Sequence, residues 1–223
     1  WRDWSSDVCS SDLCKTREAE RAFRGAQTRY VGFFSDDARQ VGTAKRRAWL
    51  HAAGKSETKN TRAVMRAWLH HKLPDDLTVC WAHLLRTTEP TAPHLKLTTW
   101  AEAEQVRQWQ NEHWFHLCPS GYEGWGHYYH EALSCGAVVV GAAHAPMDEF
   151  HAAVRLPSRP LRQQGRGTIW TVDDSDVAIA VKQLRGVSED WLAEQGFRAR
   201  LAYEKQQSES RQRWGEVLQE AGL

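Results

Sequence analysis

The chain has 223 residues, enough for one full domain and part of a second, and its charges nearly cancel at a formal net charge of +1. This balance gives no electrostatic case for a nucleic-acid or anionic-membrane partner. No apolar run reaches the roughly 18–20 residues that span a bilayer, and no secretory signal is visible, so we expect a cytoplasmic location.

The five cysteines and eleven histidines show no metal-ligand spacing. No Cys-x2-Cys pair exists, and Cys80, Cys118 and Cys135 lie in apolar runs, which is typical of reduced cysteines that behave as small hydrophobic residues. We therefore expect no metal and no cofactor.

The beginning of the chain differs from the rest. Residues 1–13, WRDWSSDVCSSDL, have no apolar period and resemble the conceptual translation of a sequencing adapter, so we expect an artefactual or disordered tail. Residues 14–47 contain a charged helical pattern, a short β-rich run over 29–34 and a polar linker. This segment is predicted to be the remnant of a preceding α/β domain.

From residue 48 onward, strand and helix patterns alternate. Strands are expected over 49–53, 77–82, 95–98, 114–118, 136–140 and 168–172. Helices are expected from a Thr61 cap, along Ala103, Val106 and Trp109, and over 127–135, 147–153 and 174–184. Short connections between such elements predict an α/β fold, a Rossmann-like parallel sheet flanked by helices.

The last third of the chain has two further features. Residues 155–167 hold two prolines, four arginines and two glycines, a composition that predicts an exposed loop. Ser188 is expected to cap a helix that runs to about residue 204, and a separate last helix is expected over 208–220.

The most informative stretch runs from Cys118 to Glu131. It places Glu123 and Glu131 eight residues apart, around a Gly124-Trp125-Gly126 turn that leads into a helix. Glycine lets the backbone approach a ligand closely, and the free N–H groups of a helix start bind phosphate. Upstream, Lys55 and Lys59 follow the first strand, and ligands of parallel sheets lie beyond the carboxyl ends of the strands.

Together these segments resemble the donor-site motifs of retaining glycosyltransferases with the GT-B fold (group 1, or family 4-like): Glu-x7-Glu, and Gly-Arg/Lys followed by Lys. The resemblance covers residues 14–150 well and the rest weakly. His144 and Asp148 depart from the residues frequent in relatives. The resemblance implies that Glu123 contacts the donor sugar near the reacting carbon and that Glu131 accepts hydrogen bonds from the ribose.

The same resemblance assigns the phosphate contacts. Lys55 and Lys59 would clasp the diphosphate and stabilise the leaving group by fixed positive charge. Backbone N–H groups around Trp125, Gly126 and His127 would hold the β-phosphate or the sugar, and Gly124 would allow close approach. Such enzymes need no bound metal, because cationic side chains and helix N-termini replace it.

The implied function is that of a glycosyltransferase of hexosyltransferase type, which transfers a glycosyl group from a nucleotide-sugar to an acceptor hydroxyl with retention. Residues 48–186 would bind the donor, and residues 187–223 would form C-terminal helices. The acceptor, a sugar, lipid or small molecule, would bind a largely missing N-terminal domain, which would also carry any peripheral membrane association. We therefore expect this chain alone to turn over little or nothing.

Other functions fit part of the same pattern. A non-catalytic nucleotide-sugar-binding module would keep the fold, and a nucleotide-sugar epimerase-like enzyme would act without an acceptor. An adapter or scaffold domain would leave the two lysines and two glutamates without a shared cleft.

Overall fold

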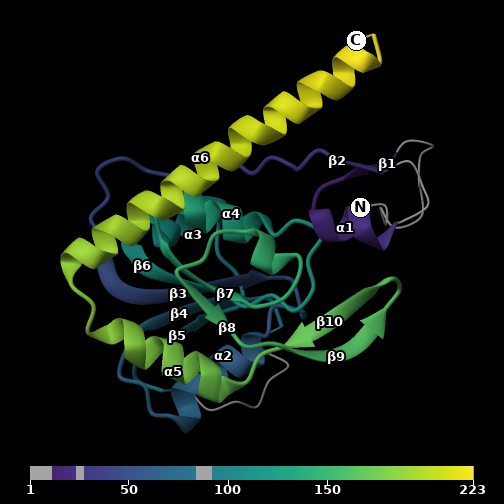
Figure 1. Cartoon of the computed structure of the whole chain (residues 1–223). Helices are drawn as coiled ribbons and strands as arrows, with labels where there is room; N and C mark the ends of the chain where they lie inside the picture. The colour runs from purple at the N-terminus through teal and green to yellow at the C-terminus, as the bar shows by residue number, and fades with distance from the viewer. Residues whose placement is uncertain (1–11, 24–27, 84–91, 223) are drawn as a thin grey trace.

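The computed structural model describes residues 12–23, 28–83 and 92–222 (Figure 1). The strands are β1 (Asp12–Cys14), β2 (Thr28–Tyr30), β3 (Arg46–Gly54), β4 (Leu77–Trp81), β5 (Leu95–Thr98), β6 (His113–Cys118), β7 (Val138–Ala142), β8 (Val154–Leu156), β9 (Arg159–Gln164) and β10 (Gly167–Thr171). The helices are α1 (Arg17–Ala22), α2 (Thr61–His70), α3 (Ala103–Glu112), α4 (His127–Ser134), α5 (Asp174–Arg185) and α6 (Glu189–Glu220). A 3₁₀ helix spans Met147–Glu149. Most of the predicted tail lies outside the described residues.

The central sheet has six parallel strands in the order β5-β4-β3-β6-β7-β8. Numbered from β3 as the first strand, this is the order 3-2-1-4-5-6 of a doubly wound sheet, which confirms the predicted fold class. The direction of winding reverses between β3 and β6. Open α/β sheets bind their ligands at this switch point, beyond the carboxyl ends of the strands.

Helices cover both faces of the sheet, with α2 and α5 on one face and α3, α4 and α6 on the other (Figure 1). The side chains of β3 alternate between these layers. Trp49 stacks on Phe115 at 4.5 Å and meets Trp68 of α2 edge-on at 6.0 Å, whereas Leu50 packs with Trp109 of α3. Burial on both faces explains why the central strands appear in the sequence as continuous apolar runs.

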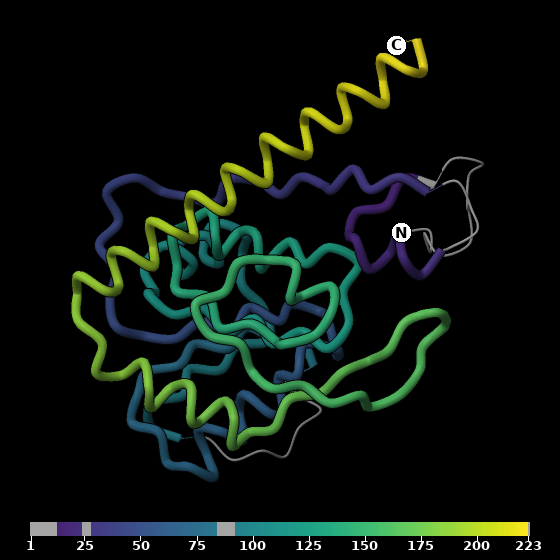
Figure 2. Tube along the Cα trace, viewed as in Figure 1, coloured from purple at the N-terminus to yellow at the C-terminus, as the bar shows by residue number. Residues whose placement is uncertain are grey.

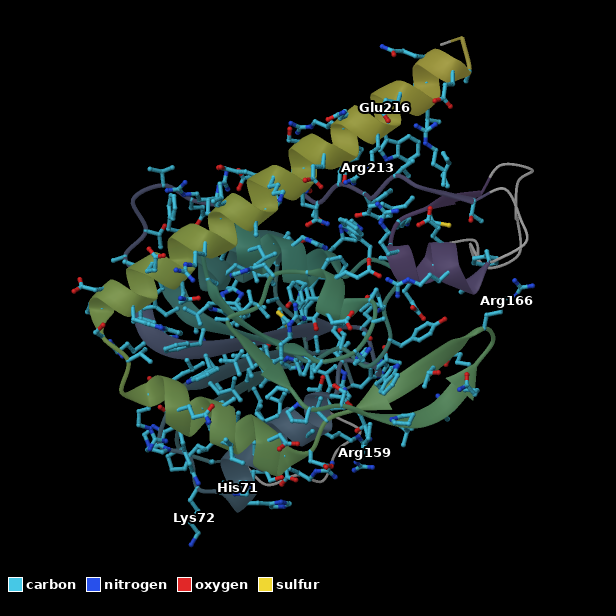
Figure 3. The ribbon with its side chains drawn as sticks, in the orientation of Figure 1. His71, Lys72, Arg159, Arg166, Arg213 and Glu216 are labelled. Carbon is cyan, nitrogen blue, oxygen red and sulfur yellow. The ribbon has the colours of Figure 1, made fainter. Side chains whose placement is uncertain are left out.

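The segment from β2 to Gln40 runs beside α6, and the far end of α6 extends beyond the sheet (Figure 2). The hydroxyl of Tyr203 in α6 donates to the carbonyl of Ser35 at 2.9 Å. Further along α6, Glu216 pairs with Arg29 at 3.1 Å, and Arg213 lies over the Tyr30 ring at 4.6 Å; Arg213 and Glu216 are labelled in Figure 3. These contacts join the beginning and the end of the chain.

Four local predictions are wrong. The helix expected over 147–153 is only the 3₁₀ turn Met147–Glu149. Residues 155–167 are not a loop: the end of β8 and all of β9 lie there, and β9 pairs antiparallel with β10. α6 is one helix rather than two. Gln207 and Ser210, which lie near the predicted break, are buried in the fold and keep the helix continuous. Thr61 is the first residue of α2 rather than its cap, which is Asn60 in a left-handed conformation (φ 52°).

The cap predicted at Ser188 is confirmed: its hydroxyl accepts a hydrogen bond from the N–H of Trp191 at 3.1 Å. Within the described part of the chain, no helix combines the length and apolar character needed to cross a membrane.

Candidate functional site

Two loops meet at the switch point of the sheet. The loop after β3 and the loop after β6 are joined by hydrogen bonds from the N–H of Gly121 to the carbonyl of Thr58 (2.7 Å) and from Asn60 Nδ2 to the carbonyl of Pro119 (2.8 Å). These bonds fix the two loops against each other. They carry Lys59 on one side and Glu123 on the other.

A chain of contacts connects Lys59 to Glu123. The ammonium of Lys59 lies 3.7 Å from the ring centroid of Tyr128. The Tyr128 hydroxyl is 2.6 Å from Ser120 Oγ, which donates to Glu123 Oε1 at 2.8 Å. Because the Ser120 proton is directed to the carboxylate, the Tyr128 hydroxyl donates to Ser120. Burial raises the pKa of Tyr128 well above its usual value and keeps this donor protonated.

Lys59 is the cation of the cluster. Burial lowers its pKa, and the negative charges of Glu123 and Glu131 oppose that shift. The structure therefore places one lysine and both predicted glutamates within electrostatic reach of one another.

Lys55 lies apart from this cluster. Its side chain is exposed, and its backbone carbonyl is 2.9 Å from His83 Nε2. The two lysines of the motif thus differ: Lys59 is packed into the site, and Lys55 is a solvated cation on the same loop.

Glu131 is held by a residue that the sequence analysis did not select. Gln110 of α3 donates from Nε2 to Glu131 Oε2 at 2.8 Å. Gln110 is itself buried, and its backbone carbonyl oxygen is 3.1 Å from His116 Nε2. One carboxylate oxygen of the half-buried Glu131 thus has a fixed donor, while Oε1 has no hydrogen-bond partner among the described residues.

The Gly-Trp-Gly turn starts α4. Gly126 is the N-cap at φ 81°, a left-handed conformation that favours glycine. Its carbonyl accepts the N–H groups of Tyr129 and His130, whereas the N–H groups of Gly126 and His127 have no acceptor in the described part of the chain. These free donors at a helix start are suited to an anion.

The side chain of Trp125 serves the structure rather than an open site, whereas the side chain of His127 is exposed. Trp125 is buried, stacks on His130 at 4.3 Å and donates from Nε1 to Ser35 Oγ at 2.9 Å. His127 Nδ1 is 3.1 Å from the same hydroxyl. Ser35 therefore ties the segment before β3 to the turn, and at Trp125 only the backbone remains for a ligand.

Glu123 and Gly124 open onto a cleft of about 950 Å³, which we call the Glu123 cleft. Its other walls are α1 and the β9–β10 hairpin, whose labelled Arg166 lies near α1 in Figure 3 and 5.0 Å from the Phe23 ring. α1 is held there by Glu149, whose carboxylate accepts the N–H groups at the start of that helix at 2.7 and 2.8 Å.

Ser120 and Gly121 are further residues of the site. The Ser120 carbonyl is 2.7 Å from His144 Nε2, and the His144 ring stacks on Trp170 at 5.2 Å. Ser120 lies three residues before Glu123, so its place in the motif was a signal. Gln110 is distant in sequence and had none, and His144 was noted only as a departure from the residues frequent in relatives.

Gly121 tolerates no side chain in this arrangement. A Cβ atom there would lie 1.9 Å from the carbonyl oxygen of Trp170, whose own N–H donates to Gly121 O at 2.8 Å. We expect Gly121→Ala to lower the free energy of unfolding by about 1–3 kcal/mol, because backbone must move. Gly215→Ala on α6, where nothing lies within 4 Å, is expected to stabilise by about 0.4–1 kcal/mol. Thermal unfolding of both variants measures the change in the free energy of unfolding. Equal changes in the two variants would contradict the close contact between Gly121 and Trp170.

Several solved structures of other proteins have a similar fold. The pneumococcal O-GlcNAc transferase GtfA, solved with UDP and GlcNAc, is 14% identical with a TM-score of 0.64, over 95% of this chain and 45% of that chain. Sucrose-phosphate synthase from Thermosynechococcus elongatus is 15% identical with a TM-score of 0.67, over 96% and 59% of the two chains. The chain thus spans about half the length of these proteins.

A third similar structure is a single domain. It is the C-terminal domain of a glycosyl transferase group 1 family protein (LpcC) from Francisella tularensis, 14% identical with a TM-score of 0.54 over 73% of this chain and 87% of that one. No protein-family model and no curated protein matches the chain in sequence. The solved structures therefore show the fold: a Rossmann-like domain like the C-terminal half of GT-B glycosyltransferases.

Proposed function

We propose that this chain is the donor-binding half of a retaining glycosyltransferase, which binds a nucleotide-sugar and presents its sugar to an acceptor hydroxyl. The observation that carries the proposal is the meeting of Lys59, Glu123 and Glu131 at the switch point of the sheet. A scaffold domain gives no reason for this cluster beside a cleft.

Each group of the cluster suits one part of such a donor. The ammonium of Lys59 and the free N–H groups at the start of α4 would bind the diphosphate and stabilise it as it leaves. Glu131, oriented by Gln110, would accept hydrogen bonds from the ribose hydroxyls. Glu123 opens onto the Glu123 cleft, where the sugar would lie.

Calorimetric titration of this chain with UDP, GDP and ADP tests the proposal. We expect one of the three to bind with a Kd in the range of about 1 μM–1 mM, as for substrates in general. Failure of all three to bind the folded chain at millimolar concentration would contradict the proposal. Binding without any sugar transfer in a protein that carries the acceptor domain would favour a non-catalytic binding module.

Lys59 and Lys55 are expected to contribute unequally. Replacing Lys59 with methionine removes the charge and keeps an apolar contact with Tyr128, and it should weaken binding of the nucleoside diphosphate by about 10–100-fold. Lys55→Met is the matched control, expected to cost less than about threefold because an exposed charge is screened by water. Calorimetric titration of both variants with the nucleoside diphosphate measures the two affinities. Equal losses of affinity would show that Lys55 also contacts the ligand.

A further inference from the structure

A second pocket lies at the other end of the sheet strands from the Glu123 cleft. Its volume is about 520 Å³, and its walls are the segment 39–45, the turn at Cys135 and the first half of α6. These walls adjoin the amino ends of β3, β6 and β7, whereas the Glu123 cleft lies beyond the carboxyl ends. The two sites share no lining residue, so this amino-end pocket is separate from the proposed donor site.

One wall of the amino-end pocket is fixed by buried hydrogen bonds. Asn111 is buried, accepts the N–H of Gln40 at 2.8 Å and donates to the carbonyl of Ala38 at 2.8 Å. The N–H of Ala38 donates to Ser134 Oγ at 3.0 Å. The pocket is therefore formed in advance rather than assembled around a ligand, which lowers the entropic cost of binding.

Two cations in the pocket form no ion pair among the described residues, although the Asp37 carboxylate interacts electrostatically with Arg39. Arg39 is in no ion pair, and the ammonium of Lys45 donates to one acceptor, the carbonyl of Asn111 at 3.1 Å. The third cation, Arg200, is already paired with Asp37 and Glu204, each at 2.7 Å. An ammonium has three donors, so Lys45 has capacity for further acceptors.

Because the Lys45 ammonium is buried, the lack of a negatively charged partner costs free energy. Burial lowers its pKa to about 8, with Arg39 adding repulsion. The neighbouring Cys135 supplies no negative charge at neutral pH, because burial raises its thiol pKa to about 11. A bound anion would restore the charge balance at Lys45.

The same pocket also has an apolar side. Phe197 and Val41, which both line it, are 65% and 89% exposed. The Lys45 ammonium lies 5.4 Å from the ring centroid of Trp114, a further part of the lining. Apolar surface of this kind next to unpaired cations suits a ligand with one anionic end and one apolar end.

We propose that the amino-end pocket is a second ligand site, which binds a small organic anion, a phosphate ester or carboxylate joined to an apolar group. Arg39 would bind the anionic group, Lys45 would lie beside it, and Phe197 and Trp114 would contact the apolar part.

Pyridoxal 5′-phosphate is a suitable probe, because it is an aromatic phosphate whose aldehyde reports the lysine beside which it binds. The aldehyde carbon and the lysine Nζ form an imine with loss of water, and borohydride then delivers hydride to give a stable secondary amine. Peptide mass spectrometry of the labelled chain gives the occupancy of each lysine. We expect Lys45 to be labelled about tenfold more than the exposed Lys182.

Matched variants and competitors test the anion contact. Arg39→Gln should lower labelling of Lys45 about tenfold, whereas Arg107→Gln, an exposed arginine on α3, should leave it unchanged. Pyridoxal, which lacks the phosphate, should label Lys45 poorly. Equal labelling by pyridoxal, or indifference to Arg39→Gln, would overturn the proposal. The nucleoside diphosphate that binds the Glu123 cleft should protect Lys59 but not Lys45, so this result is independent of the proposed function.

Discussion

In a transferase that contains this chain, replacing Glu123 with glutamine is expected to lower kcat about 10²–10³-fold. Glutamine keeps the size of the side chain and an oxygen that accepts the Ser120 hydroxyl, but it removes the negative charge beside the cleft. A carboxylate there would stabilise positive charge that develops at the sugar carbon when the diphosphate leaves. Affinity of the chain for the nucleoside diphosphate should change less than about threefold, because the phosphate contacts lie at Lys59 and α4.

Glu18 offers a matched control for this experiment. It lines the same cleft from α1, and within the described part of the chain its side chain pairs only with Arg21, at 3.7 Å. Glu18→Gln is expected to lower the rate less than about tenfold, since no contact links this carboxylate to Lys59. The rate of transfer and the calorimetric affinity are measured for both variants. Equal loss of rate and nucleotide affinity in Glu123→Gln would make Glu123 a binding or folding residue.

The second large effect is acid unfolding. Four buried histidines have pKa values below the ordinary 6.5, mainly because burial disfavours the charged ring: His51 and His113 at about 4, His130 at about 3, and His116 well below its usual range. In the unfolded chain these rings take up protons below pH 6.5, whereas in the folded chain they do not. Stability is therefore complete above pH 6.5 and lost as the pH falls from 6.5 toward 4.

Each such histidine costs up to about 1.4 kcal/mol per pH unit in that window. Against a total stability of about 5–15 kcal/mol, we expect the chain to unfold between about pH 6 and pH 4. Circular dichroism gives the midpoint, and denaturant titrations at several pH values give the slope. In His51→Gln, the slope of the unfolding free energy against pH should correspond to about one fewer proton taken up on unfolding. A free energy of unfolding that stays flat from pH 6.5 to 4.5 would contradict the assignment of neutral buried rings.

The sequence was sufficient for five of the six strands of the central sheet; it missed β8, which lies partly in the predicted loop, and the sixth predicted strand, 168–172, is β10 of the hairpin. The run 95–98 is a strand with those bounds, and 77–82 and 114–118 match β4 and β6 to within one residue. Strands buried on both faces must be apolar throughout, so their composition marks them without further context. The order of the strands was not predicted, because alternation with helices is compatible with more than one doubly wound order, and only the tertiary structure shows it.

The exposed hairpin and the continuous α6 could not be predicted in this way. All residues of β9 are exposed, so its backbone pairing with β10 imposes no apolar period. In α6 the polar residues near 205–208 were interpreted as a break, yet Gln207 is buried and Tyr203 bonds to Ser35. These elements depend on partners far away in the chain, and local composition carries no record of such partners.

The same division holds for the candidate site. The motif spacing by itself determined that Glu123 and Glu131 flank a glycine turn at a helix start, because backbone requirements for glycine are local. Only the tertiary structure decided that Lys59 and not Lys55 reaches the cluster, that Gln110 holds Glu131, and that Trp125 is buried. The direction of a loop side chain is set by the bonds that join its loop to another, here Gly121 to Thr58, and those form only when the sheet brings β3 and β6 together.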